Sequence, residues 1–153
     1  MFLDGILAIA EQQGLFKLVS KGKNNVIVES MTTGKRMPAF ATSRISTLED
    51  VAIYTLDEDV PLKKIFISIF DKFEGEKVLQ NKPTSNDYKE FMETVLPDFD
   101  KDRVYVSDIK KVVNWYNTLI DFKIITAESI KQDAEEEAKQ ETEEVKEDNT
   151  EKV

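Results

Sequence analysis

The spacing of apolar residues changes at Val60-Pro61, and this change constrains the fold more than any other feature of the chain. Before it, apolar residues form short runs separated by turn-forming stretches, whereas after it they recur every three or four residues. Short runs between turns are typical of β-strands, and the longer recurrence is typical of amphipathic helices. The sequence therefore predicts an α+β protein with a β half first and a helical half second.

The β half contains five apolar runs that suit strands. They lie at residues 6–10, 15–20, 26–31, 36–41 and 51–56. The first run also suits a helix, because Ala8 and Ala10 lie within it. Gly34 suits the positive φ of a hairpin loop, and Pro38, which has no N–H to donate, predicts an edge strand. Five short antiparallel strands favour a small SH3-like β-barrel over residues 1–57.

Three amphipathic helices are expected after Pro61, which suits the first turn of a helix. Their apolar stripes comprise Leu62, Ile65, Phe66, Ile69, Phe70 and Phe73, then Tyr88, Phe91, Met92, Val95 and Leu96, and then Ile109, Val112, Val113, Tyr116, Leu119 and Ile120. Pro97 ends the second helix, and Ser107 is the expected N-cap of the third. Short helices need partners to bury such stripes, so residues 58–125 are predicted to form a three-helix bundle.

Trp115 and Phe122 lie off the main stripe of the third helix. A helix that is apolar on two sides usually packs against two neighbours. We expect the second neighbour to be the β half, which would join the two halves into one rigid unit. The alternative is that Trp115 anchors a partner protein.

The end of the chain is strongly acidic. Residues 131–153 carry ten acidic residues against four lysines, and they hold most of the net charge of −9. They contain no aromatic residue and too few apolar ones to offset the entropy lost on ordering. We therefore predict that residues 126–153 form a largely disordered acidic tail with a helical tendency at its start. The rest of the chain is nearly balanced in charge, so the pI of 4.7 does not exclude anionic partners.

Two stretches of the chain resemble a known family. They are "GLFKLVSKGKNNVIVESMTTGKRMPAFATSRISTLEDVAIYT" and "LPDFDKDRVYVSDIKKVVNWYNTL". In order and spacing they are similar to a family of small bacterial proteins with acidic tails, classed as domains of unknown function. The resemblance covers approximately residues 1–125. It implies an N-terminal SH3-like barrel followed by a small helical domain, and it supplies no activity, ligand or functional residue.

The composition narrows the chemistry available to the chain. The absence of cysteine excludes disulfides, thiolate nucleophiles and zinc–thiolate sites, and the absence of histidine removes the commonest general base. The five glycines form no phosphate-binding loop, and no pair of carboxylates is distinguished by its spacing. We therefore expect a non-enzymatic protein with no cofactor. The start of the chain is a poor signal peptide and no apolar stretch is long enough to span a bilayer, so a cytoplasmic protein away from membranes is expected.

Three alternating aspartates, Asp98, Asp100 and Asp102, are typical of the start of an EF-hand calcium loop. A loop that starts at Asp98 requires glycine at its sixth position and glutamate at its twelfth. The chain has Arg103 and Ile109 at these positions. We interpret the segment as an acidic turn, because aspartates are favoured near the positive end of the helix that follows.

Residues 103–106 suit a short strand, either paired with the barrel or forming the wing of a winged helix. Winged helices often bind DNA. The third helix, however, carries Lys110 and Lys111 against Asp108 and Asp121, which is a weak electrostatic footprint for a nucleic acid. An ordinary packed bundle is the preferred interpretation.

A basic surface is expected on the β half. Residues 17–44 carry six lysines and arginines against one acid, Glu29. The candidate binding surface comprises Lys21, Lys23, Lys35, Arg36, Phe40 and Arg44. Lys21, Lys23, Lys35 and Arg36 lie in or beside predicted hairpin loops, and an exposed Phe40 would offer a stacking platform.

Two functions are favoured, and a third, an enzyme that uses carboxylates, would require a deep cleft with clustered acids. The first is a non-enzymatic interaction module that binds a protein partner through the barrel loops or the groove between the halves. The alternative is association with nucleic acid or the ribosome through the basic surface, with the acidic tail as an internal competitor. The alternative requires one continuous positive face, so it depends on whether Lys21, Lys23, Lys35 and Arg36 lie together.

Overall fold

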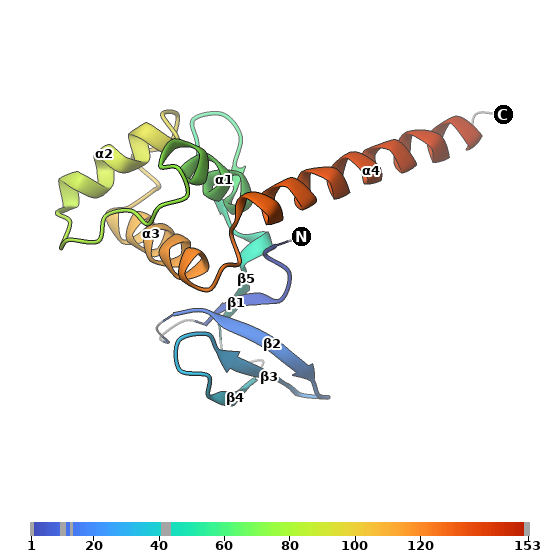
Figure 1. Cartoon of the computed structure of the whole chain (residues 1–153), viewed down its shortest axis with the longest axis horizontal. Coiled ribbons are helices and arrows are strands. Elements are labelled where there is room, and N and C mark those ends of the chain that lie inside the picture. Colours follow the sequence, from blue (N-terminus) through green and yellow to red (C-terminus); the bar gives the residue numbers. More distant parts are fainter. Residues whose placement is uncertain (1, 10–11, 13, 41–43, 152–153) are drawn as a thin grey trace.

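The computed structural model describes residues 2–9, 12, 14–40 and 44–151, and for residues 140–151 it describes the backbone alone. These residues form an α+β structure in which an antiparallel sheet lies below a group of helices (Figure 1). The strands are β1 (Ile6–Ile9), β2 (Phe16–Lys21), β3 (Asn25–Ser30), β4 (Arg36–Phe40), β5 (Ile45–Thr47), β6 (Ala52–Ile53) and β7 (Val60–Pro61). The helices are the 3-10 helix η1 (Leu48–Asp50) and the α-helices α1 (Leu62–Lys72), α2 (Ser85–Val95), α3 (Val106–Asp121) and α4 (Ala127–Glu151).

Five strands form one antiparallel sheet in the order β4-β3-β2-β1-β5. The first four strands confirm the predicted runs to within about one residue, so the helical alternative for the first run is wrong. The predicted ends at residues 10 and 41 lie outside the described residues. Gly34 has a φ of +74° in the loop between β3 and β4, as predicted. Pro38 lies in β4 at the edge of the sheet, where its missing N–H costs no interior hydrogen bond.

The fifth strand of the sheet is not the one that the sequence predicts. β5 comes from a segment expected to be a turn, and its Ile45 pairs with Ile9 and packs on an apolar cluster of the sheet. η1 then buries Leu48, and the chain passes to the helices. The predicted run 51–56 therefore contributes only the short β6, which pairs with β7 in a separate sheet. A strand of three residues carries too little alternation to be recognised from sequence.

The sheet does not close into a barrel within the described residues, which corrects the expectation of an SH3-like barrel over residues 1–57. β4 and β5 lie at opposite edges of the sheet, and Pro38 removes one backbone donor from β4. The buried residues on one face of the sheet form a cluster of their own. They are Leu7, Ile9, Phe16, Val28 and Ala39.

The helices α1, α2 and α3 confirm the three predicted helices, and their buried residues belong to the predicted stripes. Two end positions differ. Pro61 precedes α1 instead of lying in its first turn. The N-cap of α3 is Tyr105, not Ser107, and its N–H donates to Asp108 Oδ2 at 3.0 Å. Residues 103–106 therefore form no strand, because this cap draws the end of the segment into the helix.

The three helices do not form a self-contained bundle, because their core continues into the β half. Leu3, Leu15 and Leu48 are fully buried in the same apolar cluster as Phe66 of α1 and Tyr116 of α3. Burial of each leucine contributes about 1.5–3 kcal/mol relative to an exposed one. Moving the halves apart would expose this cluster, so the structure supports the expectation that they form one unit.

Residues 127–151 of the tail predicted to be largely disordered are helical in the structure, where they form α4 and project away from the sheet (Figure 1). Its start is held by specific contacts. The N–H of Ser129 donates to Thr126 Oγ1 at 3.0 Å, and Ile130 packs against the shared core. These anchors, which the composition of the tail does not reveal, fix the first turns. None of the described helices, α4 included, is both long and apolar enough to cross a membrane.

A buried ion pair sets the direction of α4. Asp133 is 2% exposed, and its Oδ2 lies 3.1 Å from Nζ of Lys63 on α1. Lys63 also pairs with Glu137, whose side chain is 48% exposed. Burial lowers the pKa of Lys63, but its hydrogen bond to Glu137 and its ion pair with Asp133 outweigh this effect and raise the pKa above its ordinary value of 10.5.

We predict that Asp133→Asn lowers the free energy of unfolding by about 2 kcal/mol, because it leaves the Lys63 ammonium, whose side chain is 16% exposed, with Glu137 alone as an ionic partner. The matched change Glu137→Gln should cost less than about 0.5 kcal/mol, because that carboxylate is exposed. Urea unfolding at neutral pH measures both. The contribution of Lys63 is fully present below its ordinary pKa and is lost as the pH rises through its raised folded-state pKa. Equal effects of the two variants would contradict this account.

Candidate functional site

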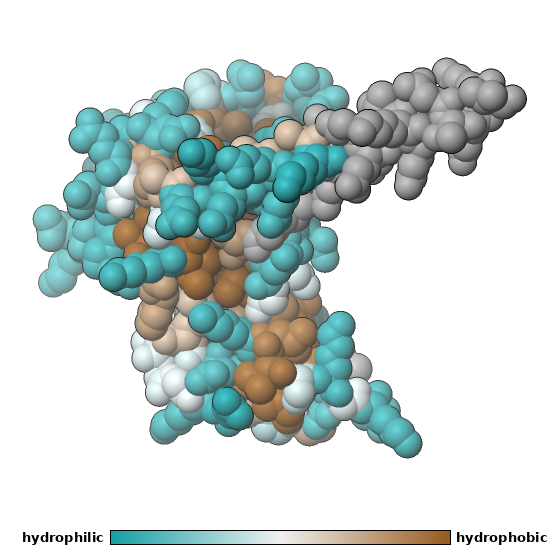
Figure 2. Space-filling model, turned by 45° about the vertical axis from the view of Figure 1, so that its right-hand side comes forward, coloured by the Kyte–Doolittle hydropathy of each residue, from teal (hydrophilic) through white to brown (hydrophobic). Residues whose placement is uncertain are grey.

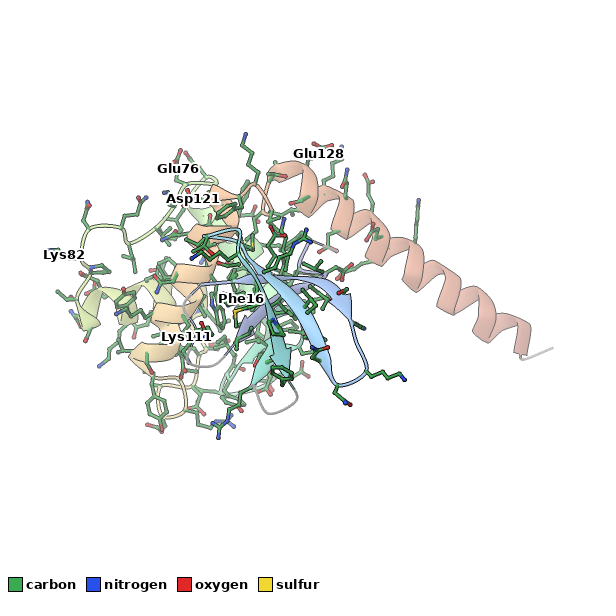
Figure 3. The ribbon with its side chains drawn as sticks, turned by 90° about the horizontal axis from the view of Figure 1, so that it is seen from below. Phe16, Glu76, Lys82, Lys111, Asp121 and Glu128 are labelled. Carbon is green, nitrogen blue, oxygen red and sulfur yellow. The ribbon has the colours of Figure 1, made fainter. Side chains whose placement is uncertain are left out.

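A groove with a volume of about 1090 Å³ runs between the sheet and α3, and we call it the sheet–helix groove. One wall comes from β1, β5 and the loop between β3 and β4, a second from α3, and a third from β6 and Tyr54. Figure 3 shows Lys111 and Asp121 on α3, beside the sheet that carries Phe16. Figure 2 shows apolar residues along the waist between helices and sheet. Ligand sites usually occupy about 300–1000 Å³, so the groove is large for a single small molecule.

The groove follows most of α3. The residues of α3 that line it run from Asp108 to Asp121. At 1.5 Å per residue this stretch is about 20 Å long. An extended chain rises about 3.3 Å per residue, so roughly six residues of an extended peptide span it. The length of the groove therefore suits an extended segment of polypeptide.

The groove combines an apolar floor with a polar rim. Trp115 and Val112 of α3 line it together with Ala8 of β1, and Trp115 is only partly exposed because it also packs against the shared core. Ala8 and Ser46 are paired on adjacent strands, so both side chains line the groove from the same face. Trp115 and the β half thus line one groove, and part of the ring remains available to a ligand.

Most charged groups in the groove already have a partner. Asp121 lies 2.9 Å from Nζ of Lys77. Asp108 accepts the N–H of Tyr105 at the start of α3. Arg44 and Lys111 are different, because no described acid pairs with either of them.

Arg103 is held at one end of the groove by two contacts that the sequence did not indicate. Its guanidinium lies 4.3 Å from the centre of the Tyr54 ring, and its Nε lies 2.8 Å from Oδ2 of Asp100. The hydrogen bond from Arg103 lowers the pKa of Asp100 below its ordinary value of 3.8. A signal for the Arg103–Asp100 pair existed in their spacing of three residues, but the position of Tyr54 depends on the tertiary fold.

The aspartate segment forms a turn stabilised by its own groups. Asp100 Oδ1 accepts the N–H of Asp102 at 3.0 Å, and the N–H of Asp100 donates to the carbonyl of Tyr54 at 2.9 Å. A second bond runs from the N–H of Leu56 to the carbonyl of Asp98 at 2.9 Å. The segment is therefore a turn, as interpreted from the sequence. It also pairs with the chain that follows β6.

The structure divides the predicted basic surface into three parts. Lys21, Lys23 and the half-exposed Phe40 lie at one end of the sheet, around the β2–β3 hairpin. Lys35 and Arg36 lie at the other end, around the β3–β4 loop, and Arg36 approaches Glu29 to 4.0 Å. About 13 Å of strand separates the two ends.

Arg44 forms the third part, because it lines the sheet–helix groove. The six predicted residues thus form no continuous face. Lys111 and Ser46 complete the groove beside Arg44, and sequence reasoning did not select either as a binding residue.

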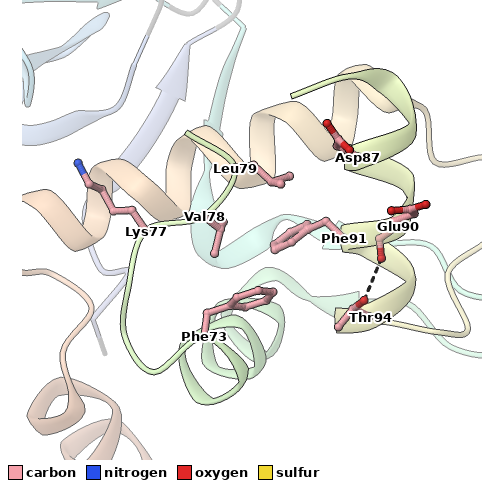
Figure 4. A pocket seen from close by; sticks show the side chains of 8 residues that line it. All are labelled: Phe73, Lys77, Val78, Leu79, Asp87, Glu90, Phe91 and Thr94. Atoms are coloured by element: carbon pink, nitrogen blue, oxygen red, sulfur yellow. Dashed lines mark hydrogen bonds between the residues drawn. The ribbon is translucent and has the colours of Figure 1, made fainter. Parts of the chain in front are cut away.

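A second cavity of about 370 Å³ lies between α2 and the loop that follows α1 (Figure 4). Phe73, Val78, Leu79 and Phe91 form its apolar walls, and the Phe73 and Phe91 rings are 5.5 Å apart. Asp87 on its rim is committed to the cap of α2, where it accepts the N–H of Thr84. The cavity suits one side chain or a small apolar group, and it is less suited to a peptide than the groove.

The loop beside this cavity is strained and is held by α3. Glu74, Leu79 and Lys82 have φ values of 54°, 49° and 45°, a region that costs a non-glycine residue about 1 kcal/mol or more. Asn117 clamps the loop, because its side-chain amide donates to the carbonyl of Val78 and accepts the N–H of Val78, both at 2.8 Å. The Tyr116 hydroxyl donates to the carbonyl of Glu76 at 3.1 Å, and burial raises the pKa of Tyr116 to about 12.

Comparison with known proteins finds two adjacent matches to family models. Residues 3–48 match a domain of unknown function, DUF5606, and residues 51–119 match a second, DUF6852. A Bacteroides vulgatus protein, whose structure was determined by NMR in solution in a structural genomics programme, is 39% identical to this chain. The alignment covers 81% of this chain and 89% of that protein, with a TM-score of 0.67. The chain belongs to this uncharacterised bacterial family.

The family assignment confirms the resemblance drawn from the sequence. The junction between the two matched regions falls at the end of η1, where the chain leaves the sheet for the helices. The matched families are defined without a function, and no curated protein matches the chain. The groove therefore has to be interpreted from its own geometry.

We predict that Asn117→Ala lowers the free energy of unfolding by about 2 kcal/mol. The change removes two hydrogen bonds and leaves both backbone groups of Val78, which is 5% exposed, without their partner. Asn114→Ala is the matched control, because Asn114 is exposed on the same helix, and it should cost less than about 0.5 kcal/mol. Urea unfolding measures both, and equal losses would show that the clamp does not hold the strained loop.

Proposed function

We propose that this protein is a non-enzymatic interaction module that binds an extended segment of a partner protein in the sheet–helix groove. The observation that carries the proposal is the length of the groove along α3, which matches about six residues of extended chain. Catalysis has no support in the groove, where each acid has a structural role: Asp108 at the cap of α3 and Asp121 opposite Lys77. A cytoplasmic location, which the sequence predicts, suits such a module.

The edge of the sheet supports an extended ligand. β5 is the last strand in the sheet order, and among the described residues it pairs only with β1. Edge strands have backbone N–H and C=O groups that an added strand can use. Ser46 of β5 lines the groove, so a bound segment would lie beside this edge and against Trp115.

The arrangement of cations argues against the nucleic-acid alternative. That alternative requires Lys21, Lys23, Lys35 and Arg36 to form one positive face, and the structure places them at two ends of the sheet. A nucleic-acid backbone needs a track of cations at the spacing of its phosphates. The groove offers only Arg44 and Lys111 without ionic partners among the described residues.

The proposal is tested by selecting peptides that bind. Random 12-residue peptides displayed on phage are selected on the full chain, and the enriched sequences are synthesised. Trp115 is the only tryptophan of the chain, so its fluorescence reports on the groove directly. We expect saturable changes in Trp115 fluorescence with micromolar dissociation constants.

We predict that Ser46→Tyr weakens binding of the selected peptides at least about tenfold, because the larger side chain fills the groove beside Trp115, a loss of about 1.4 kcal/mol. Ser20→Tyr is the matched control, since Ser20 is an exposed strand residue that does not line the groove. Tyrosine is well tolerated in strands, so both variants should fold. Failure to enrich any peptide, or equal binding by the two variants, would contradict the proposal.

A further inference from the structure

We infer that the segment bound in the sheet–helix groove is acidic, with carboxylates placed against Arg44 and Lys111. This inference rests on the proposed function and specifies the chemistry of the partner. Its basis is the set of charged side chains that line the groove, which are Arg44, Arg103, Lys111, Asp108 and Asp121.

Three of these five charged groups already have a partner within the chain. Arg103 is paired with Asp100, and Asp121 with Lys77. Asp108 is engaged at the N-cap of α3, where the positive end of the helix also stabilises a carboxylate. What the groove offers a ligand is therefore set by the remaining two charges.

Both remaining charges are positive. Arg44 and Lys111 are exposed, and no described acid pairs with either one. They come from different walls of the groove, Arg44 from the residue before β5 and Lys111 from α3. A ligand lying between these walls reaches both, and carboxylates are the complementary groups that a protein segment supplies.

The acidic tail of the chain itself does not fill the groove in this structure. The pair between Lys63 and Asp133 directs α4 away from the sheet (Figure 1). The described part of the tail therefore leaves the groove open to a segment of another protein.

The groove favours a peptide over a nucleic acid as the anionic ligand. Asp108 and Asp121 lie among its lining residues, at the two ends of the stretch of α3 that follows the groove. A phosphate backbone carries a charge at every residue and would place some of them near these acids. An acidic peptide can place uncharged residues there and its carboxylates at Arg44 and Lys111.

The test uses the full chain and three acetylated and amidated octapeptides, which alternate threonine with glutamate, glutamine or lysine. Trp115 fluorescence and amide chemical shifts at Ser46 and Thr118 report binding. We expect the glutamate peptide to bind at least about tenfold more tightly than the glutamine peptide, and the lysine peptide to bind most weakly. Arg44→Gln and Lys111→Gln should each weaken the glutamate peptide about tenfold and leave the glutamine peptide unchanged.

Lys110→Gln is the matched control, because Lys110 is an exposed neighbour of Lys111 that does not line the groove. It should leave the glutamate peptide unchanged. Equal binding of all three octapeptides, or equal effects of Lys110→Gln and Lys111→Gln, would overturn the inference.

Two further binding measurements distinguish the possible occupants of the groove. Tighter binding of a ten-residue oligouridine than of the glutamate peptide, weakened by the same two variants, would overturn the inference in favour of RNA. Tighter binding of a peptide comprising residues 131–153 would replace the partner with the chain's own tail. If phage-selected peptides bind in the groove but carry no excess of acids, the inference fails and the proposed function stands. If no peptide from either source perturbs the groove, both fail.

Discussion

The apolar core shared by the sheet and the helices is the interaction on which the rest of the structure depends. Leu3, Leu15 and Leu48 of the β half pack in one apolar cluster with Phe66 of α1 and Tyr116 of α3. Because this packing is continuous, β5 and α3 are held at a fixed distance. The sheet–helix groove is the space left between them, and its width is therefore a property of the core rather than of any loop.

The elements that the sequence predicts well are those with a repeated pattern. The stripe from Leu62 to Phe73 repeats over three turns, and only a helix can bury it. β5 has no such repeated pattern, because it is three residues long. Its place in the sheet is set by pairing with Ile9, on a strand far away in the sequence. The ordered start of α4 depends on Lys63, which lies 70 residues before Asp133, and tail composition alone carries no sign of it.

The candidate site was less predictable than the fold. Charge density along the chain selected Arg44, Lys21 and Lys35 as parts of one basic surface. In the fold, Arg44 lines the groove, whereas the two hairpins place Lys21 and Lys35 at opposite ends of β3. The sequence indicated Lys111 only weakly as a binding residue, because the opposite charge of Asp108 lies one turn away on α3. Only the fold shows that Asp108 is engaged at the helix cap and leaves Lys111 without a described ionic partner.

The distance between the sheet and α3 tests the fixed geometry of the groove most directly. The chain has no cysteine, so Lys17→Cys on β2 and Lys110→Cys on α3, both at exposed positions, accept spin labels at these two sites alone. Double electron–electron resonance on the full chain then gives the distribution of distances between sheet and helix. The account predicts a single narrow distribution, because the shared core fixes the halves. A broad or two-peaked distribution would contradict it, since a groove between independently moving halves would not present a defined surface.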